Sequence, residues 1–358
     1  MNLQERIEAV VRASSGFPWL GQLTVDAVWE WVLLELGDRP LMPQRYGRHQ
    51  VVAIPYSPIL HIVSGNTPHA ALQTLIRGIL VGGENLIKMP STGLAEIEEF
   101  VPLLPKPIQP LLDHSLPGSW LETAAAIVVF GSDETIATFA SRVSPWQRFL
   151  PHGSKVSFAF ILGDYPESIA QAAARDVHAF DQLGCLSPQF FYVENNPEKF
   201  GLQLANALEN LSRCNPLPGR AIESAAALRS FREDWRFRAA MDPRIQLWES
   251  KETLEWTVIL DPGRELESSP LHRTIFVQNL PAPDERPLAA FKHLISTIGI
   301  YPMNPDAVRQ AIQFGAQRVC PIGEMQNPPL TWHHDGWPSL SSLVRFVDIE
   351  GLSESSNE

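Results

Sequence analysis

The stretch ILHIVSGNTP, residues 59–68, decides the fold class of this chain. Residues 59–63 are apolar except for His61, a composition typical of a strand buried on both faces of a sheet. The polar turn SGN at 64–66 ends the strand, and the threonine and proline that follow suit the cap and the first position of a helix. Apolar residues then recur at helical spacing to about residue 80, where two glycines end the helix.

Two more units of strand, turn and helix follow in the first 150 residues, and another series begins near residue 156. This order is typical of parallel sheets with helices on their faces, so we predict an α/β protein. The predicted strands are 59–63, 85–89, 125–130, 156–162, 190–193, 254–260, 274–278 and 297–301. The predicted helices are 3–14, 24–36, 68–80, 93–104, 133–141, 166–180, 200–212, 220–231, 287–296 and 305–314.

Parallel sheets bind ligands at the carboxyl ends of their strands. Asn66, Lys88 and the pair Gly131 and Ser132 all fall at such ends, so we expect them at one edge of a sheet. Each also has an ordinary explanation when taken singly. An asparagine before a helix suits an Asx turn, a lysine at a strand end is usually solvated, and Gly-Ser is a common strand-to-helix turn.

Composition limits the function classes. The chain has 358 residues, which favours two domains, and its net charge of -12 argues against nucleic-acid binding. Its N-terminus, MNLQER, lacks the apolar region of a signal peptide, and no apolar run is long enough for a membrane span. Three widely separated cysteines favour a reduced, cytoplasmic protein without disulfides or structural zinc. Prolines cluster at 102–118 and 281–287, which we interpret as loops or short broken helices, and the tail after 352 as disordered.

One cysteine stands in a setting that suits catalysis. Cys185 lies in DQLGCLSPQ, residues 181–189, between an amphipathic helix and the apolar strand 190–193. A thiol at a tight junction of two rigid elements is well placed to meet a substrate. A buried, inert cysteine is nevertheless the commoner case, and we interpret Cys214 and Cys320 as structural residues.

The segment WHHD at 332–335 raises the question of a metal site. Adjacent side chains such as His333 and His334 point in different directions, and the sequence shows no third ligand beside Asp335. We therefore expect no metal, and we favour a loop that folds over the active site.

The order of these motifs resembles the aldehyde dehydrogenase superfamily, and within it the acyl-CoA reductases of the LuxC type. The resemblance spans about residues 60 to 350. The segments that carry it are HIVSGNTP (61–68), NLIKMPS (85–91), VFGS (129–132), GSK (153–155), the Cys185 segment, HDG (334–336) and LVR (343–345).

The resemblance implies an aldehyde dehydrogenase-like fold. Residues 1–152 would form a Rossmann-like cofactor-binding domain, and 153–330 an α/β catalytic domain that holds the cysteine. Residues 331–358 would return to the domain interface.

The resemblance also implies roles for single residues. Cys185 matches the family's nucleophile, and Asn66 matches the side-chain donor of its oxyanion hole. Lys88 matches the lysine that contacts the adenosine ribose of the cofactor, and Gly131 and Ser132 match the loop near the cofactor's phosphates.

Two departures from the superfamily pattern refine the function. Members that oxidise aldehydes carry a glutamate before the Gly-Gly-Lys-like motif, where this chain has Pro151 and His152. A proline cannot be a general base, which disfavours hydrolysis of an acyl-enzyme to the acid. His152 could donate or relay a proton, although a structural histidine is an equal alternative.

Where NAD-preferring relatives often carry a carboxylate, this chain has Ser91, so we expect NADPH, with NADH as the alternative.

The resemblance therefore implies reduction of a long-chain fatty acyl thioester to the aldehyde through a Cys185 thioester intermediate. An acyl-CoA or an acyl carrier would be the donor, an acyl-transferring synthetase a partner, and a homo-oligomer the assembly. One alternative is a CoA-acylating aldehyde dehydrogenase or a reductase with another acyl donor. Another, from a different class, is a non-catalytic scaffold of the same fold.

Overall fold

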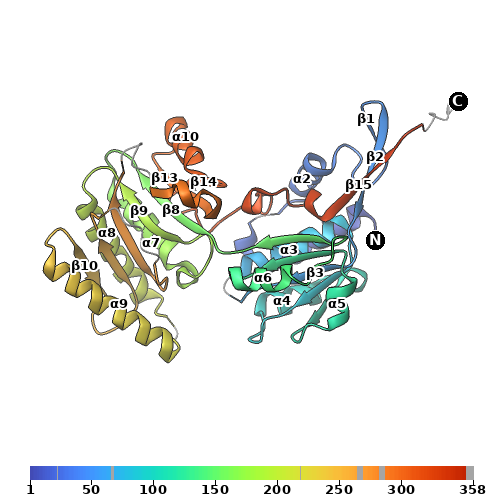
Figure 1. Ribbon diagram of the computed structural model, residues 1–358. Coiled ribbons are helices and arrows are strands. Elements are labelled where there is room, and N and C mark those ends of the chain that lie inside the picture. The colour runs from blue at the N-terminus through green and yellow to red at the C-terminus, as the bar shows by residue number, and fades with distance from the viewer. Residues whose placement is uncertain (22, 66–67, 218, 264–268, 282–286, 352–358) are drawn as a thin grey trace. The chain divides into compact units, whose positions relative to one another are not determined.

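The computed structural model describes residues 1–21, 23–65, 68–217, 219–263, 269–281 and 287–351. The chain divides into two compact units (Figure 1). Unit 1 consists of Met1–Ser154 and Pro329–Glu358, and unit 2 of Lys155–Pro328. The roles that we expect for these parts stay predictions. No helix in the described ranges has the length and apolar character needed to cross a bilayer.

Unit 1 contains a five-stranded sheet in the order β5-β4-β3-β6-β7, in which every neighbouring pair is parallel. Both faces of the sheet are covered. Side chains of α1 to α4 pack on one face, and those of α5 and α6 pack on the other. The strands are β3 (Ile59–Ile62), β4 (Asn85–Lys88), β5 (Leu111–Asp113), β6 (Ala126–Phe130) and β7 (Arg148–His152). The helices are α1 (Leu3–Ser14), α2 (Val25–Leu36), α3 (Pro68–Val81), α4 (Ala95–Phe100), α5 (Gly118–Thr123) and α6 (Asp133–Ala140).

His61, the polar residue in the middle of β3, is buried and hydrogen-bonded at both ring nitrogens. His61 is inaccessible to solvent, and its Nδ1 and Nε2 lie 2.9 Å from Thr74 Oγ1 and 2.9 Å from Asn85 Oδ1. Asn85 Nδ2 donates to Gly83 O, so Oδ1 is the acceptor for a proton on Nε2. Burial lowers the pKa of His61 to about 4. Neutral His61 therefore joins β3, β4 and α3 without a buried charge.

Unit 1 also contains a three-stranded antiparallel sheet in the order β1-β2-β15. Its strands are β1 (Gln44–Tyr46), β2 (His49–Pro55) and β15 (Val344–Ile349). They are not among the predicted strands. β1 and β15 have mostly exposed or half-buried side chains and no continuous apolar run, whereas the apolar run at 51–54 in β2 is a strand signal that the predictions did not use.

Unit 2 contains a seven-stranded sheet in the order β10-β11-β12-β9-β8-β13-β14, parallel except for β10. Helices α7 and α8 pack on one face, and α9 and α10 on the other. The strands are β8 (Val156–Ile161), β9 (Pro188–Val193), β10 (Gln246–Glu249), β11 (Thr257–Leu260), β12 (Thr274–Asn279), β13 (Ile295–Tyr301) and β14 (Arg318–Pro321). The helices are α7 (Glu167–His178), α8 (Pro197–Cys214), α9 (Ile222–Met241) and α10 (Pro305–Phe314).

The α/β class with parallel sheets is confirmed, and several element boundaries were wrong. The helix expected at 220–231 runs to Met241, and the one expected at 287–296 is a 3-10 helix, Pro287–Leu294, that gives way to β13. The proline cluster at 102–118 includes the short strand β5 among its turns. Most of the cluster at 281–287 lies outside the described residues.

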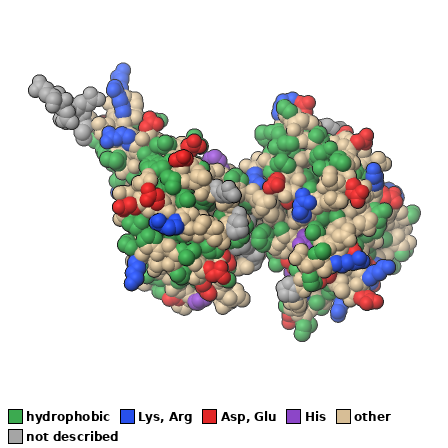
Figure 2. All heavy atoms as spheres, turned by 180° about the vertical axis from the view of Figure 1, so that it is seen from behind, with side chains coloured by type: hydrophobic (Ala, Val, Ile, Leu, Met, Phe, Trp, Pro, Cys, Tyr) green, Lys and Arg blue, Asp and Glu red, His purple; other side chains and the backbone are tan. Residues whose placement is uncertain are grey.

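Charged side chains of both signs are interspersed over the face of the molecule in Figure 2. This pattern agrees with a moderately acidic chain whose charges are spread along the sequence.

Candidate active site

The carboxyl edge of the five-stranded sheet collects most of the residues expected to bind a cofactor. Lys88 ends β4 and pairs with Ile62, the last residue of β3. Gly131 and Ser132 directly follow β6, and His152 ends the neighbouring strand β7. Because these strands are parallel, their ends meet at one edge. Asn66 lies outside the described residues, so its position is not tested.

Local structure explains the Gly-Ser pair. Ser132 caps α6, and its Oγ accepts from Thr135 N at 3.3 Å. A Cβ on Gly131 would lie 2.8 Å from Thr135 Cγ2, so a larger residue would push into the first turn of α6. Ser91, three residues beyond Lys88, is exposed. The edge thus presents a helix N-terminus, a lysine and an exposed hydroxyl, which suit a phosphate-bearing ligand.

His152 belongs to a histidine–aspartate pair that the sequence did not predict. Its Nδ1 lies 2.6 Å from Asp335 Oδ2, and the Asp335 side chain is 4% exposed. The His152 ring stacks on Phe130, with centroids 4.5 Å apart and planes inclined by 10°. The ring of His334 lies 4.5 Å from that of His152, and Trp332 stacks on His334. The carboxylate and the rings therefore fix both the position and the orientation of His152.

A buried arginine anchors the segment that carries Asp335. Arg77 of α3 donates to the carbonyl oxygens of Leu330 and Trp332, each at 3.4 Å. Burial lowers the pKa of Arg77 to about 10, and the charges of Glu35 and Asp335 oppose that shift. Glu35 in turn accepts backbone N–H groups of residues 339–341. The segment 330–341 is thereby held against α2 and α3 of unit 1.

His152 also supplies the third potential metal ligand that the sequence did not reveal. The donor atoms of His152, His334 and Asp335 lie within 4.8 Å of one another. The 2.6 Å contact between His152 and Asp335 is a hydrogen bond, and His334 Nε2 lies 4.0 Å from the same oxygen. The nearby Arg77 cation would oppose a divalent ion. The expectation that no metal binds stays a prediction.

Cys185 is exposed and follows a turn in unit 2. Its backbone oxygen accepts from Ser157 Oγ at 2.7 Å, and the same Oγ accepts from Thr297 N. Phe180, Asp181 and Gln182 have φ values of 52°, 52° and 61°. Left-handed backbone costs about 1–2 kcal/mol per non-glycine residue, so this turn needs support from its surroundings. The helix expected to reach residue 180 therefore ends at His178.

Asp181 supplies much of that support. Its carboxylate lies 3.0 Å from Arg220 Nη2, 2.6 Å from His272 Nδ1 and 3.6 Å from Arg273 Nε. Residues 271–273 are also left-handed, with φ of 64°, 54° and 59°. Gln182 adds a second link, because its Nε2 donates to Pro188 O and Thr274 O. Two strained turns are thus joined beside Cys185. No sequence pattern indicates these contacts, because the partners of Asp181 lie about 40 and 90 residues away along the chain.

A buried carboxylate holds a further loop near the cysteine. Asp176 accepts from Gly323 N at 2.6 Å and Met325 N at 3.0 Å. Burial raises the pKa of Asp176 to about 7, against the opposing effect of these two hydrogen bonds. In the same loop Gln326 Nε2 donates to Ser187 Oγ at 3.1 Å, two residues after Cys185. The loop 323–326 therefore buttresses the cysteine segment.

The family is decided by a sequence comparison. The model of the family described as acyl-CoA reductase (LuxC) matches residues 108–346, more than half of the chain. The chain belongs to the LuxC family.

Curated relatives of this LuxC-family chain are named long-chain acyl-protein thioester reductases. A long-chain acyl-protein thioester reductase from Vibrio harveyi is 26% identical over 360 residues, which cover 93% of this chain and 73% of the relative. A protein of the same name from Photorhabdus laumondii is 25% identical and covers 93% and 72%.

Solved structures establish the fold of this LuxC-family chain. A putative methylmalonate-semialdehyde dehydrogenase from Sinorhizobium meliloti has a TM-score of 0.69 at 13% identity, covering 98% of this chain and 85% of that one. An NADP-dependent glyceraldehyde-3-phosphate dehydrogenase from Bacillus halodurans has a TM-score of 0.68 at 13% identity, covering 97% and 86%. The expected aldehyde dehydrogenase-like fold is confirmed.

Proposed function

We propose that this chain reduces a long-chain fatty acyl thioester to the aldehyde through an acyl-enzyme on Cys185. The observation that carries the proposal is an exposed cysteine on a braced, strained turn, in a chain whose relatives are named long-chain acyl-protein thioester reductases. Strained turns of this kind concentrate at active sites because they hold a reactive group in one position.

The residues present suit a nicotinamide dinucleotide. Lys88 would contact the ribose, and the turn at Gly131 and Ser132 would accept phosphate at the N-terminus of α6. The reduced nicotinamide supplies a hydride when bound. Exposed Ser91 can donate to a 2′-phosphate that a carboxylate would repel, so we propose NADPH over NADH.

Cys185 would act as the nucleophile. Its thiolate attacks the thioester carbon, the new C–S bond forms, and the donor's thiolate leaves with a proton from the site. The side chain of Asn66 and the N–H of Cys185 would donate to the oxyanion. Loss of one such donor typically costs about 3 kcal/mol of transition-state stabilisation. A hydride delivered to the acyl carbon and a proton delivered to its oxygen would give a thiohemiacetal on Cys185, and its collapse would release the aldehyde and the Cys185 thiol.

We propose His152 as the residue that donates and accepts protons in the reaction. Asp335 accepts the Nδ1 proton, which leaves Nε2 to take up or release a proton. Pro151, at the position of the superfamily's glutamate, has no group that could activate water. The absence of that glutamate disfavours hydrolysis of the acyl-enzyme and favours hydride transfer to the acyl carbon.

The names of the relatives favour an acyl-protein as donor, with acyl-CoA as the second candidate. We propose an acyl-transferring synthetase as the partner that delivers the acyl group, and a homo-oligomer as the assembly. A nucleophilic thiol suits the reducing cytoplasm, which is the compartment we propose.

The test is NADPH oxidation in the presence of a long-chain acyl-CoA or an acylated protein. Cys185→Ala should abolish turnover, and Cys214→Ala, which removes the other exposed cysteine, should leave it intact. Equal turnover in Cys185→Ala would refute the covalent mechanism. Faster turnover with NADH would overturn the cofactor preference. Absence of turnover with both donors, and of cofactor binding, would favour a non-catalytic scaffold.

A further inference from the structure

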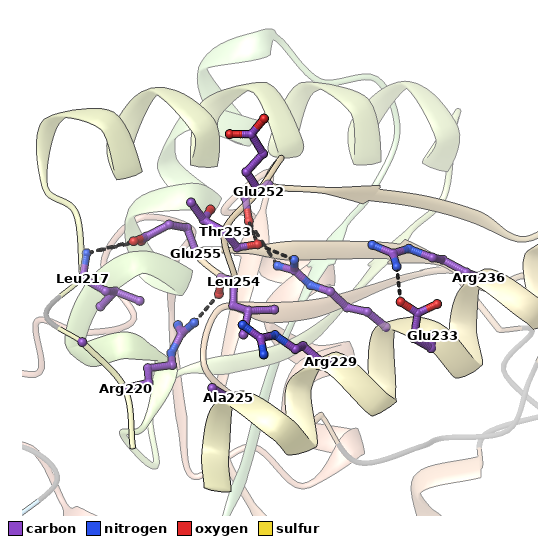
Figure 3. A pocket seen from close by; sticks show the side chains of 13 residues that line it. Leu217, Arg220, Ala225, Arg229, Glu233, Arg236, Glu252, Thr253, Leu254 and Glu255 are labelled. Carbon is purple, nitrogen blue, oxygen red and sulfur yellow. Dashed lines mark hydrogen bonds and ion pairs between the residues drawn. The ribbon is translucent and has the colours of Figure 1, made fainter. Parts of the chain in front are cut away.

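Unit 2 contains a polar pocket of about 440 Å³ that the mechanism above does not use. It lies between α9 and the loop 250–255 (Figure 3). Buried Arg232 is one of its lining residues and donates to Thr253 O at 2.7 Å and Trp256 O at 2.8 Å. The loop is therefore fixed to the helix, and the pocket is a built feature.

Arginines dominate the lining of this pocket. Its four arginines face three glutamates, of which Glu233 pairs with Arg236 and Glu255 accepts from Leu217 N and Arg273. The third, Glu252, points away from Arg220 and Arg229 in Figure 3. The three carboxylates are thus paired with Arg236, held by Leu217 N and Arg273, or turned from Arg220 and Arg229.

Two arginines at that side have unused hydrogen-bond donors. Arg229 is exposed, forms no ion pair with any residue of the described ranges, and extends from α9 toward Leu254 (Figure 3). Arg220 Nε is buried and has no acceptor among the residues that the structure describes. Burial lowers the pKa of Arg232 to about 10. The charge of Glu249 opposes this shift, and the like charges of Arg236 and Arg220 add to it. Glu249 lies 3.4 Å from Arg232 and 2.7 Å from Arg236, so Arg229 and the Nε of Arg220 are the groups left for an anion.

The pocket is connected to the nucleophile. Arg220 lines it and also donates to Asp181 at 3.0 Å, four residues before Cys185. A ligand held by Arg220 would therefore be held by a residue that braces the catalytic turn.

We propose that this pocket binds the phosphate ester of a phosphopantetheine-type acyl donor. The proposal rests on the proposed function and names the part of the donor that the protein recognises. Guanidinium groups match the oxygens of a phosphate, and a flexible pantetheine arm separates that phosphate from the thioester carbon. Binding energy taken up at such a remote group helps to orient the reacting carbon.

The test compares a donor that has the phosphate with one that lacks it. Arg229→Ala is measured beside the control Arg213→Ala, which removes an exposed arginine of α8 that does not line the pocket. We expect the ratio of kcat/KM for acyl-CoA to that for the acyl thioester of N-acetylcysteamine to fall about tenfold in Arg229→Ala only, as for loss of one charge-assisted hydrogen bond. An unchanged ratio overturns the proposal.

Two further measurements complete the test. An acylated carrier protein is assayed in parallel, and the donor with the higher kcat/KM identifies the source of the phosphate. Calorimetric titration with CoA needs no turnover, so it tests the pocket even if the proposed reaction fails. Weaker CoA binding in Arg229→Ala supports the pocket, and equal binding in both variants refutes it.

Discussion

Replacing Asp181 by alanine is the sharpest perturbation of the catalytic turn. The substitution removes the carboxylate shared by Arg220, His272 and Arg273, and the side chains of the two arginines are only 11% and 4% exposed. Breaking a buried pair by removing one partner costs about 3–5 kcal/mol. Arg273 keeps Glu255 at 3.2 Å, and Arg220 keeps two carbonyl acceptors, so we expect about 3 kcal/mol, at the low end.

Asp181→Asn is the matched control. Asparagine tolerates the left-handed backbone and keeps an oxygen acceptor, so we expect a loss of about 1–2 kcal/mol. The assay is urea denaturation followed by tryptophan fluorescence; three of the ten tryptophans, Trp235, Trp248 and Trp256, lie in unit 2 and report its unfolding. Alkylation of Cys185 by iodoacetamide, measured in a Cys214→Ser background, reports the geometry of the turn separately. An unfolding free energy for Asp181→Ala within about 0.5 kcal/mol of the wild type would refute the reasoning.

Two further predictions concern pH. His61 has a folded-state pKa of about 4, below its ordinary 6.5, so its side chain takes up a proton in the unfolded state first. The contribution of His61 to the free energy of unfolding therefore falls as pH drops from about 6.5 to 4. The loss should approach 3 kcal/mol at about 1.4 kcal/mol per unit, and His61→Gln should lack this slope in urea titrations. Asp176 has the opposite effect, because burial raises its pKa from 3.8 to about 7. The contribution of Asp176 to the free energy of unfolding therefore falls as pH rises from about 3.8 to 7. Asp176→Asn should flatten that slope, and an unchanged slope would contradict the assignment.

Sequence reasoning succeeded where a local pattern determines the structure. The run at 59–63 is apolar because β3 is covered on both faces, by α3 on one side and α5 on the other. Since parallel strands end at a common edge, the positions of Lys88 and Gly131 followed from strand order alone. Neither inference needed knowledge of distant contacts.

It failed where distant segments decide. Asp335 orients His152 across 183 positions, and no spacing rule connects them. The turn at 180–182 contains no glycine, so propensity predicts that α7 continues, whereas the contacts of Asp181 and Gln182 offset the backbone strain. The three-stranded sheet was not predicted because β1 and β15 are too exposed to show an apolar pattern, although the apolar residues 51–54 of β2 could have indicated a strand.

The course of the chain through its two units has a consequence for biosynthesis. β2 pairs along its length with β15, from Gln50 with Ile349 to Pro55 with Val344, although unit 2 is translated between them. A nascent chain therefore emerges with β2 lacking its main partner until after residue 344, and unit 2 is finished while unit 1 is still incomplete. The entropic cost of bringing β2 and β15 together rises only slowly with the length of chain between them, so the intervening unit adds little to that cost. The pairing of β2 with β15 is therefore the last part of unit 1 to form during synthesis.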